Sequence, residues 1–385
     1  MVLSKVFKVG VFMEPIRVLQ VVPNMHAAGL ETLIMNLYRN IDRTKIQFDF
    51  LVHYTQKYFY DDEIESLGGH IYRLSFREDN NLIKYVKDLD KFFTEHNQYY
   101  IVHGHMASTA FFYLRAAKKH HVPIRILHSH NTSTEKNLKG LIKQQMLKIS
   151  TRYANTYYAC GIMAGKFLYG NKNFEVINNA IDLERFKKDS KLRADTRKKY
   201  GLNDYFVIGH IGRFNSQKNH KFIIDVFEQY YKKNPNARLV LVGEGELESS
   251  IKQIVKDKKL LDVVKFLGVL KDTEAIYNMF DVFLLPSLFE GLPVVGVEVQ
   301  ACECNAILSD KITKEVKLTN YISYLPIEGE DAALKWADKI SQLEKNKVSD
   351  NEVYKKLTKA GFNIKEEAKR LEEKYLDLIQ EKGDK

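Results

Sequence analysis

Short apolar runs alternate with amphipathic segments along most of this chain. In the first half, apolar runs at 16–22 and 48–53 predict two strands, and the sequence at 68–72, which opens with a glycine pair, begins a third. Between the first two, apolar residues recur at helical spacing over 30–41, which predicts a helix packed on a sheet. The alternation continues to about residue 185. This pattern predicts an open parallel sheet of the α/β class.

The alternation restarts in the second half. Its predicted strands lie at 205–212, 237–243, 263–268 and 281–287. An amphipathic helix is predicted at 222–231, and another at 364–379 ends the pattern. The 385 residues suffice for two domains, each with its own core.

Composition narrows the class of protein. The apolar content of 45% is that of a globular chain, and the formal net charge of +10 favours an acidic partner. Such a partner is a nucleic acid, an anionic lipid or a phosphorylated small molecule. Three cysteines do not form a disulfide framework or a zinc motif, which favours a reducing, cytoplasmic compartment. Residues 1–12 lack the pattern of a signal peptide and are interpreted as an extension ahead of the fold.

Two glutamates follow the predicted strand at 281–287. Glu290 lies in the loop, and Glu298 lies inside a helix that is expected to begin near Pro293. The first amides of that helix are free to bind an anion. Valines surround Glu298 in sequence, so its carboxylate needs a partner, and a vicinal diol of a sugar suits it. The turn between loop and helix comprises Gly291, Leu292, Pro293 and Val294.

Two basic residues follow the predicted strand at 205–212. The strand ends at Gly212, and the loop before the next helix holds Arg213 and Lys218. A diphosphate fits this place, because an arginine fork contacts two oxygens and a lysine adds a point charge. Gly243 and Gly245 follow the next strand and are interpreted as framing a nucleoside.

The predicted strand ends of the first half carry histidines. His103 and His105 follow one strand, and His128 and His130 follow the next. Their spacing permits metal binding, but no carboxylate or cysteine accompanies them at motif spacing, so hydrogen bonding to a polyhydroxylated ligand is favoured and no metal is expected. In the first loop, Gly29 could let a phosphate or sugar approach backbone amides, although a turn glycine without a ligand explains it as well.

The segment 136–152 combines apolar residues at helical spacing with lysines and arginines. Two interpretations stay open. A basic amphipathic helix can lie on an anionic membrane, and an ordinary surface helix can pack its apolar side on a sheet.

Together these motifs resemble a known family. Gly212-Arg213 followed by Lys218, then Gly243-x-Gly245, then Glu290 and Glu298, resemble the signature of the retaining glycosyltransferases of family 4, which have the GT-B fold. The resemblance extends over nearly the whole chain from Met13. The segments 30–39 and 48–52 further resemble bacterial members that build capsular or exopolysaccharides.

The resemblance implies two Rossmann-like domains that face a cleft. Residues 13–185 would form the acceptor side, with the helix at 364–381 packed back on it, and residues 186–363 would bind the nucleotide-sugar. The implied activity is that of a retaining hexosyltransferase, which moves a sugar from a UDP-sugar to a polysaccharide or lipid-linked oligosaccharide. No cofactor is implied beyond the donor itself, and the expected location is the cytoplasm or the inner face of the plasma membrane.

The resemblance also implies roles for individual residues. The diphosphate would bind Arg213 and Lys218, the ribose Glu298, and the donor-sugar hydroxyls Glu290. His130 would be the active-site histidine, with His128 as the alternative. The implied nucleotide-sugar site comprises Gly29, Gly212, Arg213, Lys218, Gly243, Gly245, Glu290, Gly291, Leu292, Pro293, Val294 and Glu298.

The chemistry of these residues fits that activity without a metal. Departure of a diphosphate builds negative charge, which fixed cations and helix amides stabilise. Other classes of function remain as alternatives: a catalytically silent GT-B partner subunit, or a nucleotide-sugar epimerase. A nucleic-acid binder rests on net charge alone and lacks basic motifs interleaved with aromatic residues, so no nucleic acid is expected as a partner.

Overall fold

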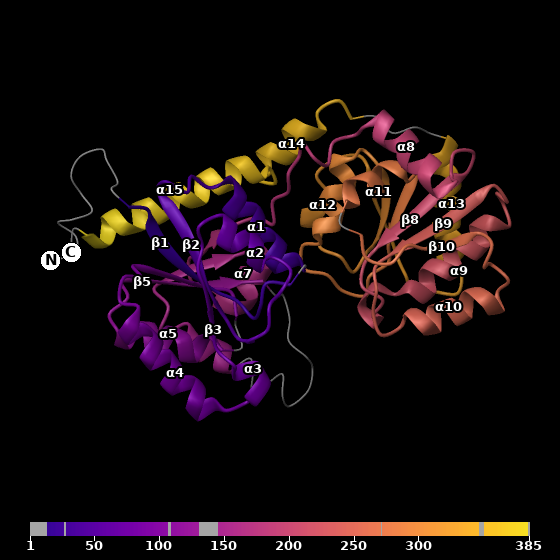
Figure 1. The fold of residues 1–385 in the computed structure, drawn as a ribbon. Coiled ribbons are helices and arrows are strands. Elements are labelled where there is room, and N and C mark those ends of the chain that lie inside the picture. Colours follow the sequence, from indigo (N-terminus) through magenta and orange to yellow (C-terminus); the bar gives the residue numbers. More distant parts are fainter. Residues whose placement is uncertain are drawn as a thin grey trace. The chain divides into compact units, whose positions relative to one another are not determined.

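The computed structural model describes residues 14–26, 28–106, 109–130, 145–270, 272–345 and 350–383. The chain folds into two compact units (Figure 1). Unit 1 comprises residues 1–180 and 363–385, and unit 2 comprises residues 181–362.

Unit 1 is built on a parallel sheet of seven strands in the order β3-β2-β1-β4-β5-β6-β7. The register places Ile16 opposite Ile46 and Val18 opposite Ile101. The strands are β1 Ile16–Val21, β2 Ile46–Val52, β3 Ile71–Arg73, β4 Ile101–Gly104, β5 Ile124–Ser129, β6 Thr156–Ala159 and β7 Glu175–Val176. Both faces of the sheet are covered, which is why its strands read as apolar runs in the sequence.

Helices form a layer on each face of this sheet. The helices are α1 Gly29–Asn40, α2 Asp61–Ser66, α3 Phe76–Asp79, α4 Leu82–Glu95, α5 Ala110–Lys119, α7 Ile162–Tyr169 and α15 Ile364–Gly383. The final helix, α15, is drawn in yellow beside α1 in Figure 1, and it buries Leu371 and Tyr375 in the same core as Tyr38 of α1. Residues near the end of the chain thus complete the N-terminal core.

Unit 2 repeats the arrangement with six parallel strands in the order β10-β9-β8-β11-β12-β13. The strands are β8 Phe206–Ile211, β9 Ala237–Val242, β10 Val264–Phe266, β11 Val282–Leu285, β12 Asn305–Ser309 and β13 Ile322–Leu325. The helices are α8 Ser190–Tyr200, α9 His220–Tyr231, α10 Glu248–Asp257, α11 Thr273–Met279, α12 Val294–Ala301, α13 Ala332–Lys345 and α14 Val353–Lys359. The predicted fold class, α/β with parallel sheets, is confirmed.

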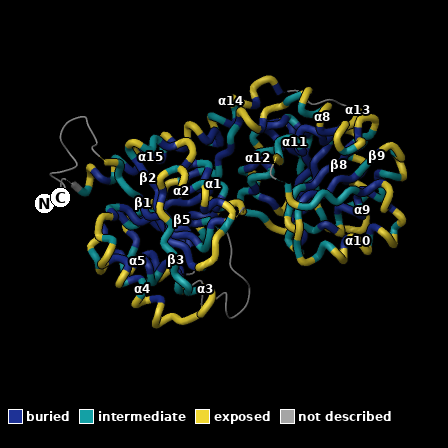
Figure 2. Tube along the Cα trace, in the orientation of Figure 1, coloured by how far each residue is buried: buried dark blue, intermediate teal, exposed yellow. Residues whose placement is uncertain are grey.

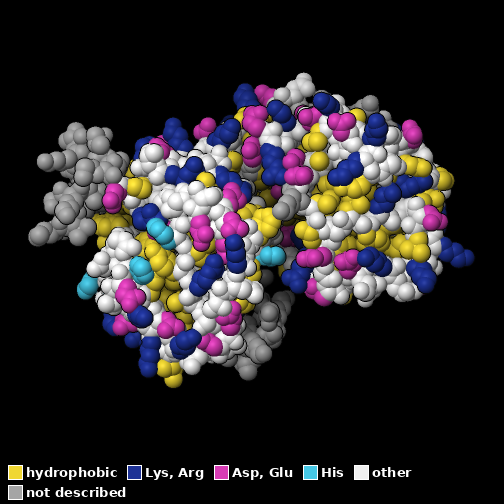
Figure 3. Space-filling view, in the orientation of Figure 1, with side chains coloured by type: hydrophobic (Ala, Val, Ile, Leu, Met, Phe, Trp, Pro, Cys, Tyr) yellow, Lys and Arg dark blue, Asp and Glu magenta, His cyan; other side chains and the backbone are white. Residues whose placement is uncertain are grey.

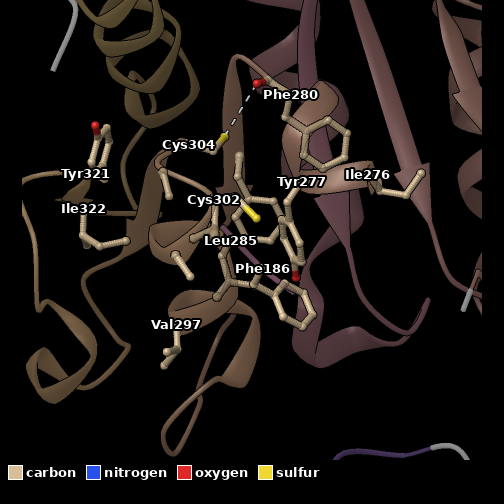
Figure 4. Packing of buried hydrophobic residues seen from close by; sticks show 14 of the residues in the cluster. Phe186, Ile276, Tyr277, Phe280, Leu285, Val297, Cys302, Cys304, Tyr321 and Ile322 are labelled. Carbon is tan, nitrogen blue, oxygen red and sulfur yellow. Dashed lines mark hydrogen bonds between the residues drawn. The ribbon is translucent and has the colours of Figure 1, made fainter. Parts of the chain in front are cut away.

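The cores of unit 2 lie on both faces of its sheet. The inner strands β9, β8, β11 and β12 appear mostly dark blue in Figure 2, because most of their residues are buried. Figure 4 shows one core, in which Phe186 and Tyr277 pack together with ring centroids 6.2 Å apart. In the same core the thiol of Cys304 donates to the carbonyl oxygen of Phe280.

One sequence prediction concerns membranes. The predicted basic helix at 136–152 lies outside the described residues except for 145–152. Among the helices that the structure describes, none combines the length and the apolar character needed to cross a bilayer.

The surface charge is mixed in sign on the face drawn in Figure 3, where lysines and arginines are interspersed with aspartates and glutamates.

One buried carboxylate of unit 1 was not singled out by the sequence. Asp49 of β2 has no exposed surface. Its oxygens accept hydrogen bonds from both Nε and Nη2 of Arg17, from the hydroxyl of Tyr99 and from the amide of His70. Burial alone would raise the pKa of Asp49, but these hydrogen bonds outweigh it, and the pKa is lowered from its ordinary value.

We expect Asp49→Asn to destabilise the protein by about 3 kcal/mol, since it removes one partner of a buried ion pair. A carboxylate with a lowered pKa contributes stability above its ordinary pKa and loses it as the pH falls. The difference between wild type and variant should therefore shrink below about pH 4. Urea unfolding at several pH values measures both effects.

The matched control is Asp62→Asn, which breaks the exposed ion pair between Lys57 and Asp62. Exposed pairs contribute about 0–1 kcal/mol, so this control should barely change stability. Equal losses in the two variants would contradict the assigned role of Asp49.

Candidate active site

Three loops of unit 2 meet at the carboxyl ends of neighbouring strands. In the sheet β9 lies beside β8, and β8 lies beside β11. The loops that follow these strands hold residues 212–219, 243–247 and 286–293. Because the strands are parallel, all three loops emerge at the same edge of the sheet.

The structure joins the basic loop and the acidic loop directly. Nζ of Lys218 lies 2.5 Å from Oε1 of Glu290, and the two side chains are only 17% and 10% exposed. The loop backbones are joined as well, because the amide of Leu288 donates to the carbonyl oxygen of Gln217 at 2.8 Å. The side chain of Gln217 donates in turn to the carbonyl oxygen of Phe289 at 2.9 Å. These contacts hold Lys218 and Glu290 in a fixed geometry.

Lys218 is also positioned by its own turn. It ends the short 3-10 helix Ser216–Lys218, in which the side chain of Asn215 accepts a hydrogen bond from the Lys218 amide at 3.1 Å. Asn219, the next residue, has a positive φ of 55°, a conformation that asparagine adopts more readily than most residues. The turn leads into α9, so Lys218 stands at the strand-to-helix junction that the sequence predicts.

Arg213 lies in the same loop but makes a different contact. Its guanidinium is 70% exposed and pairs with Glu246, with Nη2 3.2 Å from Oε2. The structure gives it no direct contact with Glu290 or Glu298 among the described residues. Glu246 was missed by the sequence reasoning, although it follows the glycine pair at 243–245 immediately.

The glycines at 243 and 245 have a structural explanation. A Cβ at Gly243 would lie 2.2 Å from the carbonyl oxygen of Gly212, and one at Gly245 would lie 2.5 Å from that of Phe214. The φ of Gly243 is +133°, in the region that favours glycine. The loops also exchange backbone bonds, since Phe214 donates to the carbonyl oxygen of Glu244. Their part in nucleoside binding stays a prediction.

The helix after Glu290 begins as the sequence predicts. Pro293 is the residue before α12, and no side chain caps the first turn. Amides at the start of a helix without a side-chain cap are available to an anion. Leu292 and Val294 pack against the core of the unit, which fixes the turn that contains them.

Glu298 lies within α12 and is partly buried. It accepts a hydrogen bond of 2.8 Å from the hydroxyl of Tyr277 in α11. Burial raises the pKa of Glu298 to about 7, although the bond from Tyr277 and the charge of Arg185 act in the opposite direction. The sequence predicted that this carboxylate needs a partner, but it did not identify Tyr277.

The four histidines form a cluster in unit 1. The imidazoles of His103 and His128 are hydrogen-bonded between Nε2 and Nδ1 at 3.1 Å, and those of His105 and His130 between Nδ1 and Nε2 at 3.0 Å. Burial lowers the pKa of His103 and of His130 to about 3, and it lowers the pKa of the other two as well. All four rings are therefore neutral at pH 7.

A metal ion in this cluster would have to displace hydrogen bonds of the imidazole nitrogens. Nitrogens of His103, His105 and His128 lie within 4.8 Å of one another, which is close enough for a shared ion. Both ring nitrogens of His103 and of His105 already make hydrogen bonds, as does Nδ1 of His128. The prediction that no metal binds stays a prediction.

Gly29 is the first residue of α1. A Cβ at this position would meet no atom within 4 Å, so packing does not require a glycine there. Its proposed contact with the ligand stays a prediction.

Both halves of the chain match known protein families. Residues 27–185 match the family model described as "Glycosyltransferase Family 4", and residues 193–363 match "Glycosyl transferases group 1". The putative glycosyltransferase EpsF of Bacillus subtilis is 36% identical over 309 residues, which cover 78% of this chain and 80% of EpsF. The chain belongs to the family 4 glycosyltransferases.

Two further proteins are similar to this family 4 glycosyltransferase. An Escherichia coli enzyme named as a UDP-Gal:alpha-D-GlcNAc-diphosphoundecaprenol alpha-1,3-galactosyltransferase is 27% identical over 321 residues, covering 78% of this chain and 81% of that enzyme. The crystal structure of Anabaena HepE in complex with UDP has a TM-score of 0.70 at 16% identity, covering 95% of this chain and 97% of HepE. The predicted GT-B fold is confirmed.

The raised pKa of Glu298 generates a prediction about stability. A carboxyl whose pKa is raised on folding favours the folded state at low pH, and that contribution is lost as the pH rises through about 7. Relative to Glu298→Gln, wild type should lose about 1–3 kcal/mol between pH 5 and pH 8, since each pKa unit corresponds to about 1.4 kcal/mol. Urea unfolding across this range measures the difference.

The matched control is Glu366→Gln, which removes an exposed carboxyl from α15. Its difference from wild type should stay constant across the same pH range. A constant difference for Glu298→Gln as well would contradict the assigned environment of Glu298.

Proposed function

We propose that this glycosyltransferase moves a sugar from a UDP-sugar to a lipid-linked or polysaccharide acceptor, with retention of anomeric configuration, in capsule or exopolysaccharide biosynthesis. The observation that carries this proposal is the contact between Lys218 and Glu290 beside the uncapped start of α12. The name of the Escherichia coli relative and the complex of HepE with UDP support a UDP-sugar donor.

Lys218 supplies positive charge for the leaving diphosphate. An ammonium group has three donors, so Lys218 can keep its bond to Glu290 and still donate to a phosphate oxygen. The amides at the start of α12 add donors that need no reorganisation during the reaction. Arg213, which is exposed at the same loop, offers a fork for two further oxygens. These groups stabilise the developing charge, so we propose a metal-independent transfer.

The two glutamates receive different parts of the donor. Glu290 is ion-paired with Lys218, and its other oxygen can accept from hydroxyls of the transferred sugar. Glu298 can accept from the ribose diol while Tyr277 holds its carboxyl in place. His130 remains our candidate for the histidine that contacts the donor sugar.

We expect Lys218→Ala to lower kcat/KM for transfer from a UDP-sugar by about a hundredfold or more, as the loss of a fixed donor to a developing negative charge does. The matched control is Lys221→Ala. Lys221 is 69% exposed on α9 and pairs with Asp225, four residues further on in the same helix, so its loss should change kcat/KM less than twofold. Transfer rates with a panel of UDP-sugars and an undecaprenyl-diphosphate-linked acceptor measure both variants.

The same assay separates the alternatives. An anomerically inverted product would contradict retention, and conversion of the UDP-sugar without an acceptor would favour an epimerase. A chain that neither binds nor turns over any nucleotide-sugar would be a silent partner subunit.

We also propose that the protein works at the inner face of the plasma membrane. Support comes from the diphosphoundecaprenol acceptor in the name of the Escherichia coli relative and from the basic pattern of residues 136–152.

Replacing Lys139, Lys143 and Lys148 by glutamine should weaken binding to phosphatidylglycerol vesicles tenfold or more, since each basic residue near an anionic surface contributes about 1 kcal/mol. The control replaces Lys191, Lys198 and Lys199, which are exposed on α8. Co-sedimentation measures both triple variants. Equal losses in the two would contradict a specific role of 136–152.

A further inference from the structure

The two histidine pairs of unit 1 are joined through Gln20 of β1 and Tyr375 of α15. The amide nitrogen of Gln20 contacts the hydroxyl of Tyr375 at 3.4 Å, and that hydroxyl contacts Nδ1 of His103 at 2.6 Å. The amide oxygen of Gln20 contacts Nε2 of His105 at 2.8 Å. One continuous network therefore runs from His128 through His103, Tyr375, Gln20 and His105 to His130.

The direction of each hydrogen bond follows from its neighbour. An amide nitrogen only donates, so the Tyr375 oxygen accepts from Gln20. That leaves the proton of the Tyr375 hydroxyl available to Nδ1 of His103, and we assign the bond in this direction. A neutral imidazole has one N–H, so His103 carries it on Nε2 and donates to Nδ1 of His128. His128 must then carry its proton on Nε2, a buried atom without a hydrogen-bond partner among the described residues.

The other arm is determined in the same way. The amide oxygen of Gln20 only accepts, so His105 donates from Nε2 and its Nδ1 accepts from Nε2 of His130. His130 therefore keeps a lone pair on Nδ1. His130 is the partly exposed member of the cluster, whereas His103, His105 and His128 are buried.

The fully reversed network is a second self-consistent state. Turning the Gln20 amide over would reverse every bond and move the proton of all four imidazoles to Nδ1. The orientation of the Gln20 amide selects between the two states. Its nitrogen faces Tyr375 and its oxygen faces His105, which is the arrangement of the Nε2–H state.

We propose that Gln20 and Tyr375 are positioning residues that hold all four histidines as Nε2–H tautomers. His128 then presents an N–H donor, and His130 presents a lone pair. Burial keeps every ring of the network neutral, so its members change tautomer without changing charge.

The proposal has a consequence for the substrate, and this consequence rests on the proposed function. A ligand group that meets Nδ1 of His130 must donate a hydrogen bond, which a sugar hydroxyl does and an ionised phosphate oxygen does not. The tautomer thus selects the carbohydrate part of a nucleotide-sugar or acceptor rather than its diphosphate. It also gives α15 a chemical role, because the hydroxyl of Tyr375 determines a proton position at the ends of β4 and β5.

Nitrogen NMR of the full chain with ¹⁵N-labelled histidine tests the tautomers directly. Long-range correlations to the ring protons distinguish a protonated nitrogen from one with a lone pair, and His→Gln variants assign the four rings. We expect protonated Nε2 in His103, His105, His128 and His130 at pH 7. Protonated Nδ1 in these rings would overturn the proposal, and this result needs no positioning variant to fold.

Two variants test the positioning role. Tyr375→Phe removes the hydroxyl that fixes His103, so the signals of His103 and His128 should shift toward a mixture of tautomers. The matched control is Tyr158→Phe, which removes a hydroxyl from another buried ring. The Tyr158 ring packs edge-on against His103 and His128, with ring centroids 5.5 and 6.1 Å apart. The control should leave the tautomers unchanged. Equal spectra for both variants would overturn the role of Tyr375.

Activity provides a second readout. With a UDP-sugar, Tyr375→Phe should lower kcat/KM about tenfold, and Tyr158→Phe less than twofold. If the spectra follow the expectation but no UDP-sugar is turned over, the proposed function fails and the tautomer assignment stands. If Tyr375→Phe shifts the spectra and leaves kcat/KM unchanged, the tautomer has no part in the transfer reaction. The proposal that Tyr375 is a positioning residue for this reaction then fails, and the proposed transferase function stands.

Discussion

The ion pair between Lys218 and Glu290 depends on the order of strands in one sheet. The two residues are separated by 72 positions, yet β8 and β11 are neighbours, and parallel strands release their loops at the same edge. Because both side chains are largely withdrawn from water, each charge needs the other as its partner. The strand order of the sheet therefore determines the geometry of the candidate site as well as the fold.

The fold was predictable because the central strands of both sheets are buried on both faces. Apolar runs at 16–22 and 281–287 predict β1 and β11 to within a few residues, and helical spacing predicts α1 and α15. Short, partly exposed strands have a weaker hydrophobic pattern in the sequence than long buried strands. The third strand of unit 1 holds only Ile71–Arg73, all partly exposed, so its position followed from a glycine pair rather than from hydrophobic pattern.

Only those site residues that directly follow a predicted strand could be found from the sequence. Lys218 and Glu290 were found because each follows a predicted strand, and parallel strands bring such residues together. Tyr277 and Glu246 were missed because each acts on the site through one side-chain hydrogen bond to a residue distant in sequence, and no periodicity marks such a bond. Asp49 was missed for a related reason, since it occupies a strand whose residues are all buried and its partners come from separate elements.

The two units offer opposite kinds of polar chemistry. Unit 2 presents charges in Lys218, Arg213 and Glu290, which suit a diphosphate that gains negative charge as it departs. Unit 1 presents imidazoles that burial keeps neutral. Four charged imidazoles at these distances would repel one another, whereas neutral rings can donate and accept hydrogen bonds among themselves. This is a physical reason to bury the four histidines together.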